Sequence, residues 1–172
     1  MRSLRVIGRR KVHSGEINLW REKFLLGGKV IAKEIVEQKD SVGIVPVSGS
    51  DVILVRQYRS AAGKVLIEIP AGQIEKSETP RQAAVREMAE EIGFSGKLWP
   101  VAKWYLAPGY STELMHVFVA TSLRKIARGP LDDDESIIIN RIKLSVALKK
   151  CLNGEIQDSK TVAALFAYSQ SD

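Results

Sequence analysis

The chain has 172 residues, enough for one domain whose core needs neither disulfides nor a structural metal. Its balance of 45% hydrophobic and 27% charged residues is that of an ordinary globular protein, and no apolar run has the length of a membrane span. The single cysteine, Cys151, excludes a disulfide framework, and the basic N-terminus lacks the apolar segment of a signal peptide. We therefore expect a reducing, cytoplasmic location and no contact with a membrane.

The net charge of +6 is concentrated at one end of the chain. Residues 1–33 contain nine Lys or Arg against two Glu, so the remaining residues are close to neutral. A basic segment attracts phosphate groups of a nucleotide or a nucleic acid. It can equally be a solvated edge strand on which Lys and Arg discourage aggregation, and this is the more common case.

Residues 1–40 predict a small N-terminal β-region. Residues 4–12 and 16–26 alternate in hydropathy, and Lys29–Lys39 is rich in Val and Ile, so three strands are expected. Trp20 stands among charged neighbours, where its ring could stack on a base, although a core or interface Trp is more common.

Three strands are predicted next, and they end beside a glycine loop. Val42–Val47 and Asp51–Val55 flank a turn, Arg56–Arg59 projects polar groups beyond the second strand, and Lys64–Ile69 forms the third. Glu68 breaks the apolar pattern of that third strand just before the loop. This carboxylate indicates a site shared with the acidic segment that follows, and the alternative is a rim residue paired with a nearby Arg.

A helix is predicted from Pro80 to Ile92. Thr79 and Gln82 form a capping box, Pro80 occupies the first helical position, and Gly93 is a typical terminator. Ala84, Met88 and Ile92 recur every four residues and predict the buried stripe.

The same helix carries three carboxylates, Glu87, Glu90 and Glu91, whose spacing places them on one face. Like charges at this spacing repel each other, and a hard divalent cation such as Mg2+, which takes oxygen ligands, would compensate them. A solvated acidic face is the alternative. The capping box, the preceding glycine loop and the interposed Arg86 favour the metal.

The rest of the chain predicts strands followed by helices. The expected order is two strands around a hydroxyl-rich loop, an acidic cluster Asp132–Glu135, a third strand and two helices (Leu98–Leu106, Leu114–Ala120, Ser136–Ile142, Leu144–Leu152 and Lys160–Tyr168). Together with the earlier elements this predicts an α/β fold, with a mixed β-sheet and helices on its faces.

The stretch from Gly72 to Phe94 resembles the Nudix box of the Nudix hydrolase superfamily. All nine fixed positions of that box are present (Gly72, Glu78, Arg86, Glu87, Met88, Glu90, Glu91, Gly93 and Phe94). Flanking segments are similar to the ADP-ribose pyrophosphatase branch (Val55–Arg59, Glu68–Gly72, Pro108 and Gly154–Thr161). The resemblance implies a Nudix-type α/β/α sandwich over residues 41–172, preceded by the N-terminal β-region.

The resemblance also implies an activity, namely Mg2+- or Mn2+-dependent hydrolysis of ADP-ribose to AMP and ribose 5-phosphate. The metal ligands would be Glu87, Glu90, Glu91, Glu135 and the Ala71 carbonyl, with Glu90 either a ligand or a support to one. Gly72, Glu78, Arg86 and Gly93 would have structural roles in the box. The alternatives are a hydrolase of another nucleoside diphosphate sugar such as GDP-mannose, and a Nudix-fold module that binds RNA or a nucleotide.

The general base and the substrate contacts are implied more loosely. Glu135 is the first candidate for the base, Asp133 and a box glutamate are the others, and Glu135, Glu91 and Glu87 together form the expected catalytic set. Trp20 would stack on the adenine and Arg59 would bind the diphosphate or the terminal ribose, while Glu68 and Glu113 would contact ribose hydroxyls or a metal. Members of the branch are typically homodimers whose N-terminal strands cross to the partner, and a nucleic-acid partner is not expected.

Overall fold

The computed structural model describes residues 4–129 and 137–171 of the chain. Its residues group into two compact units: Met1–Asp40 with Tyr105–Leu114, and Ser41–Trp104 with Met115–Asp172. The division at Asp40 coincides with the end of the predicted N-terminal region. The structure differs from that prediction by adding the 105–114 loop to the first unit. The reason is backbone pairing, since the Val36 amide donates to the Tyr110 carbonyl at 2.7 Å and the Thr112 amide to the Val36 carbonyl at 3.1 Å.

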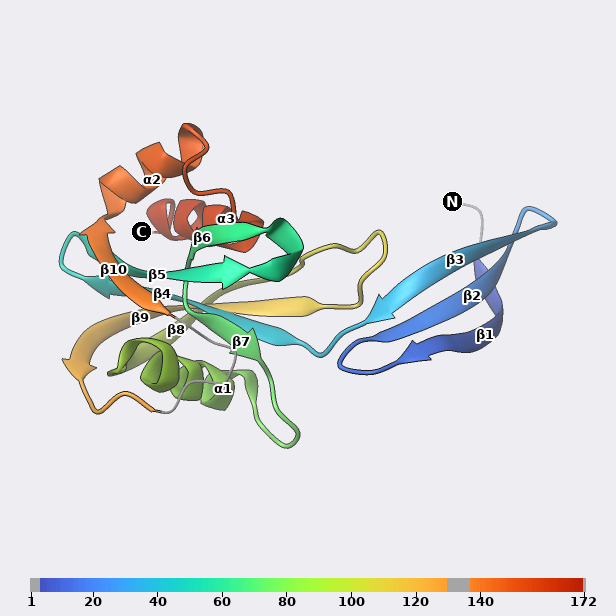
Figure 1. Ribbon diagram of the computed structural model, residues 1–172, viewed down its shortest axis with the longest axis horizontal. Coiled ribbons are helices and arrows are strands. Elements are labelled where there is room, and N and C mark those ends of the chain that lie inside the picture. The colour runs from blue at the N-terminus through green and yellow to red at the C-terminus, as the bar shows by residue number, and fades with distance from the viewer. Residues whose placement is uncertain (1–3, 130–136, 172) are drawn as a thin grey trace. The chain divides into compact units, whose positions relative to one another are not determined.

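The N-terminal unit is built on a three-stranded antiparallel sheet in the order β1-β2-β3 (Figure 1). Its strands are β1 (Arg5–Ser14), β2 (Asn18–Leu26) and β3 (Lys29–Glu37). The register of β1 on β2 shifts at Ile7 and again at Val12. Between these two shifts, Arg9 on β1 pairs with the oppositely charged Glu22 on β2, and Arg10 pairs with the like-charged Arg21.

The second unit contains a seven-stranded sheet. Its main path is β10-β5-β4-β9-β8, with β6 paired to β5 and β7 paired to β4. The β4 and β9 strands are parallel and the other recorded pairs are antiparallel, so the sheet is mixed as predicted. The strands are β4 (Ser41–Ser48), β5 (Asp51–Arg59), β6 (Lys64–Glu68), β7 (Ala71–Gln73), β8 (Phe94–Tyr105), β9 (Leu114–Lys125) and β10 (Ile138–Lys143).

Three helices flank this sheet, with α1 on one side and α2 and α3 on the other (Figure 1). They are α1 (Pro80–Glu87), α2 (Leu144–Leu152) and α3 (Ser159–Ser169). The predicted α/β/α sandwich is therefore confirmed. In the described parts of the chain, no helix is long and apolar enough to cross a membrane.

The core on the α1 side explains how the helix is held. The predicted buried stripe is fully enclosed, because Ala84 and Met88 are completely inaccessible and pack with Val42, Ile44 and Phe118 of the sheet. The predicted single helix from Pro80 to Ile92 needs a correction, since it continues after Glu87 as a π-helical turn, Met88–Ile92. Such wider turns inside helices are frequently found at functional sites.

Candidate active site

The capping chemistry expected from the sequence orients the acidic helix. The Thr79 hydroxyl accepts from the Gln82 amide at 3.3 Å, and the Gln82 side chain accepts from the Thr79 amide at 2.9 Å. At the other end Gly93 adopts a φ of 69°, a left-handed conformation that favours glycine, and the chain turns directly into β8. Both predicted ends of the helical segment are therefore confirmed.

Arg86 holds the acidic side chains of the box in place. Its Nε and one terminal nitrogen donate to the Glu78 carboxylate at 2.8 and 3.0 Å. Its other terminal nitrogen donates to Glu87 at 2.7 Å and to Glu90 at 3.0 Å. A further bond reaches the Gln73 carbonyl at 3.0 Å, so one guanidinium ties the loop to the helix. Lysine could not reproduce this planar set of donors.

These contacts shift the titration of both partners. The hydrogen bond from Arg86, helped by the Glu75 amide, lowers the pKa of Glu78 to about 2. The same hydrogen bond, together with the charges of the neighbouring carboxylates, raises the pKa of the Arg86 guanidinium above its ordinary value. The Glu78–Arg86 pair, called here the Arg86 clamp, is therefore ionised at neutral pH.

Glu87 and Glu91 are directed inward, against the loop that precedes the helix. They are only 8% and 2% exposed, and Glu91 Oε2 accepts from the Ala71 amide at 3.1 Å. A Cβ atom on Gly72 would lie 2.0 Å from Glu87 Oε1, so the absence of a side chain there makes room for the carboxylate. The alternative of a solvated acidic face is thus not what forms, because the carboxylates converge on Ala71 and Gly72.

The donor set of this convergence suits a hard divalent cation. The carboxylate oxygens of two buried side chains, Glu87 and Glu91, are ligands of the kind that Mg2+ prefers. Among the described residues no group of three His, Cys, Asp or Glu side chains is arranged ready to hold a metal. Arg86 accounts for part of this, since its bonds occupy oxygens of Glu87 and Glu90. The predicted ligand Glu135 and the alternative base Asp133 lie outside the described residues.

Arg59 and Glu68 form a pair rather than two independent groups. Arg59 Nε and one terminal nitrogen donate to the two Glu68 oxygens, each at 2.8 Å. Glu68 is 1% exposed and also contacts Lys160. Burial raises the pKa of the Glu68 carboxyl, but the bonds from Arg59 and Lys160 outweigh it and hold the pKa below the ordinary value. Pairing with a nearby Arg, the alternative considered from the sequence, is therefore the arrangement observed.

The two remaining predicted substrate contacts, Trp20 and Glu113, belong to the N-terminal unit. Trp20 donates through its indole N–H to Glu37 at 2.9 Å, and Arg9 lies 3.9 Å from the centre of its ring. The backbone amide of Glu113 donates to the Ser111 hydroxyl at 3.2 Å. The sequence did not identify Glu37 as the partner of Trp20, because the two residues are brought together only by the pairing of β2 with β3.

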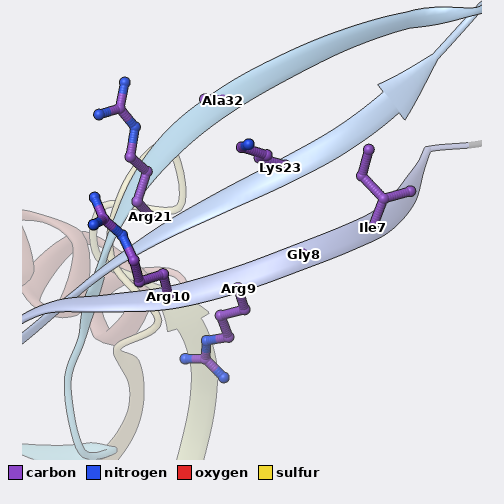
Figure 2. A pocket seen from close by; sticks show the side chains of 7 residues that line it. All are labelled: Ile7, Gly8, Arg9, Arg10, Arg21, Lys23 and Ala32. Atoms are coloured by element: carbon purple, nitrogen blue, oxygen red, sulfur yellow. The ribbon is translucent and has the colours of Figure 1, made fainter.

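A hollow of about 610 Å³ lies on the N-terminal sheet (Figure 2), and none of its lining residues belongs to the Nudix-box segment Gly72–Phe94. Arg10, Arg21 and Lys23 line it together with Gly8 and Ala32. The Arg9 side chain points to the opposite face of the strand (Figure 2), where it pairs with Glu22 at 3.1 Å and Glu37 at 2.8 Å. The described residues that line the hollow include no carboxylate, so the hollow lacks the oxygen ligands that a divalent cation takes from Asp or Glu.

Comparison with known proteins identifies the family to which the chain belongs. The NUDIX domain family matches residues 37–162. The chain is 35% identical over 172 residues to an ADP-ribose pyrophosphatase of Bacillus subtilis (strain 168), covering 96% of this chain and 93% of that protein. It is 32% identical over 151 residues to a GDP-mannose pyrophosphatase of Salmonella arizonae, covering 80% and 78%. The crystal structure of an ADP compounds hydrolase has the same fold, with a TM-score of 0.88, 22% identity, and coverage of 99% of this chain and 94% of that one.

Proposed function

Because the chain belongs to the NUDIX domain family, we propose that it is a hydrolase that cleaves the diphosphate linkage of ADP-ribose, giving AMP and ribose 5-phosphate. The observation that carries this proposal is the intact box. All its fixed residues are present, and Arg86 holds Glu87 and Glu90 while Glu91 lies against Ala71. A binding module would tolerate loss of these carboxylates, so their retention favours an enzyme over a nucleotide- or RNA-binding protein.

Members of the family use divalent cations, and for this chain we favour Mg2+ or Mn2+. Glu87 and Glu91 would be the main ligands, supported by Glu90, Glu135 and the Ala71 carbonyl. When bound, the cation supplies neutralising charge for the diphosphate and lowers the pKa of a water molecule. The chain's own contribution is positional: Gly72 leaves room for the Glu87 carboxylate, and Arg86 fixes the side chains around it.

Hydrolysis requires a water to attack one phosphorus of the diphosphate and to pass its proton to a base, while the bridging P–O bond breaks and the other phosphate leaves with the bridging oxygen. We assign that base first to Glu135, with Asp133 and a box glutamate as the alternatives. Arg59 would bind the diphosphate or the terminal ribose through the part of its guanidinium that Glu68 leaves free. In this arrangement Glu68 orients Arg59, and it would contact substrate only if its hydrogen bonds with Arg59 were broken.

The N-terminal unit would complete the site in a homodimer. Trp20 would stack on the adenine and Glu113 would contact a ribose hydroxyl, as the resemblance implies. Residues 1–40 would then act in dimerisation and substrate binding, and residues 41–172 would carry the chemistry. A cytoplasmic location and the absence of a nucleic-acid partner belong to the same proposal.

The direct test is incubation of the purified protein with ADP-ribose and either Mg2+ or Mn2+, followed by chromatographic analysis of products. We expect equal amounts of AMP and ribose 5-phosphate. If no AMP forms with either metal, the substrate assignment is wrong.

GDP-mannose is the second candidate substrate, because the likeness to a GDP-mannose pyrophosphatase covers 80% of the chain. A panel of nucleoside diphosphate sugars, compared by kcat/KM under one set of conditions, separates the two. A preference for GDP-mannose over ADP-ribose would assign the chain to that sister activity.

A further inference from the structure

Lys160 is a largely buried cation that the proposed reaction does not use. It lies in the first turn of α3, its side chain is 12% exposed, and its Nζ contacts Glu68 and donates to Asp158 at 2.9 Å. Burying an ammonium group is costly unless it is paired and hydrogen-bonded, and here two carboxylates supply both. Lys160 falls within the Gly154–Thr161 segment of the sequence resemblance, but no role was predicted for it, because its partner Glu68 is 92 residues away.

The contact connects α3 to Arg59 through Glu68. Arg59 binds Glu68 with Nε and one terminal nitrogen, and its remaining terminal nitrogen has no recorded partner in the described parts of the chain. The Arg59 side chain is 39% exposed whereas Glu68 is 1% exposed. The free terminal nitrogen of the guanidinium is therefore on the more exposed side, while the two bonded nitrogens are fixed by the buried Glu68 carboxylate.

The charges of this cluster are balanced by Lys160. Arg59 and Lys160 face Glu68 and Asp158, so the four groups sum to zero. Without Lys160 two carboxylates would face one guanidinium. The positive potential that Arg59 presents to an anionic substrate would then fall, even with Arg59 itself unchanged.

The same turn of α3 also holds the backbone that leads to the box. The Thr161 hydroxyl is fully buried, accepts from the Ile69 amide at 2.8 Å and donates to Asp158 at 2.5 Å. Two residues further on, the Ala71 amide donates to Glu91. In Figure 1 this end of α3 lies beside β6, in agreement with these contacts.

We propose that the Asp158–Thr161 turn is a positioning device for the active site, in which Lys160 sets the Arg59 guanidinium through Glu68, and Thr161 sets the Ile69–Ala71 backbone against Glu91. Neither residue touches substrate. This inference rests on the proposed function, since it assigns Arg59 to substrate binding and Ala71 to the metal side of the site.

The first test compares Lys160→Met, Lys160→Arg and Lys150→Met. Lys150 is the matched control because it also pairs with a glutamate, Glu155, but the two side chains are 29% and 51% exposed. We expect Lys160→Met to raise KM about tenfold, which corresponds to weakening of one charge-assisted contact between Arg59 and the substrate, with a much smaller change in kcat. Lys160→Arg should recover most of the lost affinity, and Lys150→Met should match the wild type.

Each other result contradicts the Lys160 assignment. Wild-type KM in Lys160→Met would show that Arg59 needs no support from α3. Equal effects in Lys160→Met and Lys150→Met, or no recovery in Lys160→Arg, would indicate a general effect on the fold. Thermal unfolding of the variants is recorded alongside, so that kinetic and structural losses are separated.

The second test uses Thr161→Val and Thr161→Ser, which remain informative if Lys160→Met fails to fold. Valine keeps the shape but removes the acceptor for the Ile69 amide, whereas serine keeps it. We expect valine to lower kcat about tenfold with little change in KM, and serine to stay near the wild type. Similar kinetics for valine and serine would overturn the backbone part of the proposal.

Both tests are run with whichever nucleoside diphosphate sugar the wild-type enzyme hydrolyses best. A wrong substrate assignment then shows in the wild type alone. Failure of the positioning proposal shows only in the differences between variants.

Discussion

At the scale of single residues, Arg86 shows how far spacing in a sequence determines contacts. A helix fixes which side chains lie three or four residues apart on one face, so Glu87, Glu90 and Glu91 could be placed together from the sequence. The inward direction of Glu87 depends on Gly72, and the space that this glycine leaves can be recognised only when its backbone is seen against the helix. The Lys160–Glu68 contact had no local signal at all.

Glutamine in place of Glu87 or Glu91 tests the role of the carboxylate charge. In the Glu91→Gln variant the amide oxygen could still accept from Ala71, so the fold should persist, while the anionic oxygen that a divalent cation needs is lost. Mutating even the supports of metal ligands costs about 10- to 100-fold, so we expect kcat/KM to fall by about 100-fold or more.

The measurement is steady-state hydrolysis at saturating Mg2+, with circular dichroism to verify folding. Full activity in both variants would remove the metal-binding role from this helix.

Glu78 provides a pH-dependent test of the Arg86 clamp. Its pKa is lowered from 4.5 to about 2 by the hydrogen bond from Arg86. A carboxyl with a depressed folded-state pKa contributes stability above its unfolded pKa and loses that contribution as pH falls through the folded value. The stability difference between wild type and Glu78→Gln should therefore be constant above about pH 5 and shrink between about pH 4.5 and about pH 2.

Chemical denaturation across this pH range measures the difference. Glu75→Gln is the control, because it removes a neighbouring carboxylate but keeps the backbone amide that donates to Glu78. A Glu78→Gln difference that persists unchanged down to the folded-state pKa would contradict the clamp.

At the scale of secondary-structure elements, the features that neighbouring residues determine were predicted correctly. The features that depend on contacts with other elements were not. The two ends of the acidic helix followed from Thr79, Pro80 and Gly93. The length of β5 did not, because Arg56–Arg59 was expected beyond the strand end and instead pairs with β6, with Arg59 opposite Lys64. Partner strands extend an element past the point where its own hydropathy pattern stops. The π-helical turn likewise had no signal in the capping residues.

Thr79→Ala tests whether the capping box formed by Thr79 and Gln82 stabilises the helix that carries the Nudix-box glutamates. The substitution removes the acceptor for the Gln82 amide and should lower the free energy of unfolding by about 1 kcal/mol. Thr79→Ser retains the hydroxyl and serves as the control. Urea unfolding with an unchanged m-value gives the difference, and equal midpoints for Thr79→Ala and wild type would show that Pro80 and packing suffice.

At the scale of the whole molecule, the sequence predicted the fold class and an N-terminal region ending near Asp40. It did not predict that the 105–114 loop joins that region, because the pairing of Val36 with Tyr110 and Thr112 spans more than 70 residues. The predicted site residues divide in the same way. The box lies within one unit, whereas Trp20 and Glu113 lie in the other.

A subunit-mixing experiment tests whether the N-terminal unit serves a partner's box. If the protein is a homodimer in which Trp20 of one subunit completes the site of the other, Trp20→Ala and Glu91→Gln lie in different halves of each site. Each variant alone should be weakly active. After unfolding and refolding together, half of the dimers should be mixed and each should contain one intact site, giving about a quarter of wild-type activity.

Mixing Glu87→Gln with Glu91→Gln is the matched control, because both changes affect the same box and no intact site can form. Sedimentation velocity over a range of concentrations establishes the dimer independently. Activity in the Trp20→Ala and Glu91→Gln mixture that stays at the average of the two separate variants would place Trp20 with its own subunit's box, or outside the site altogether.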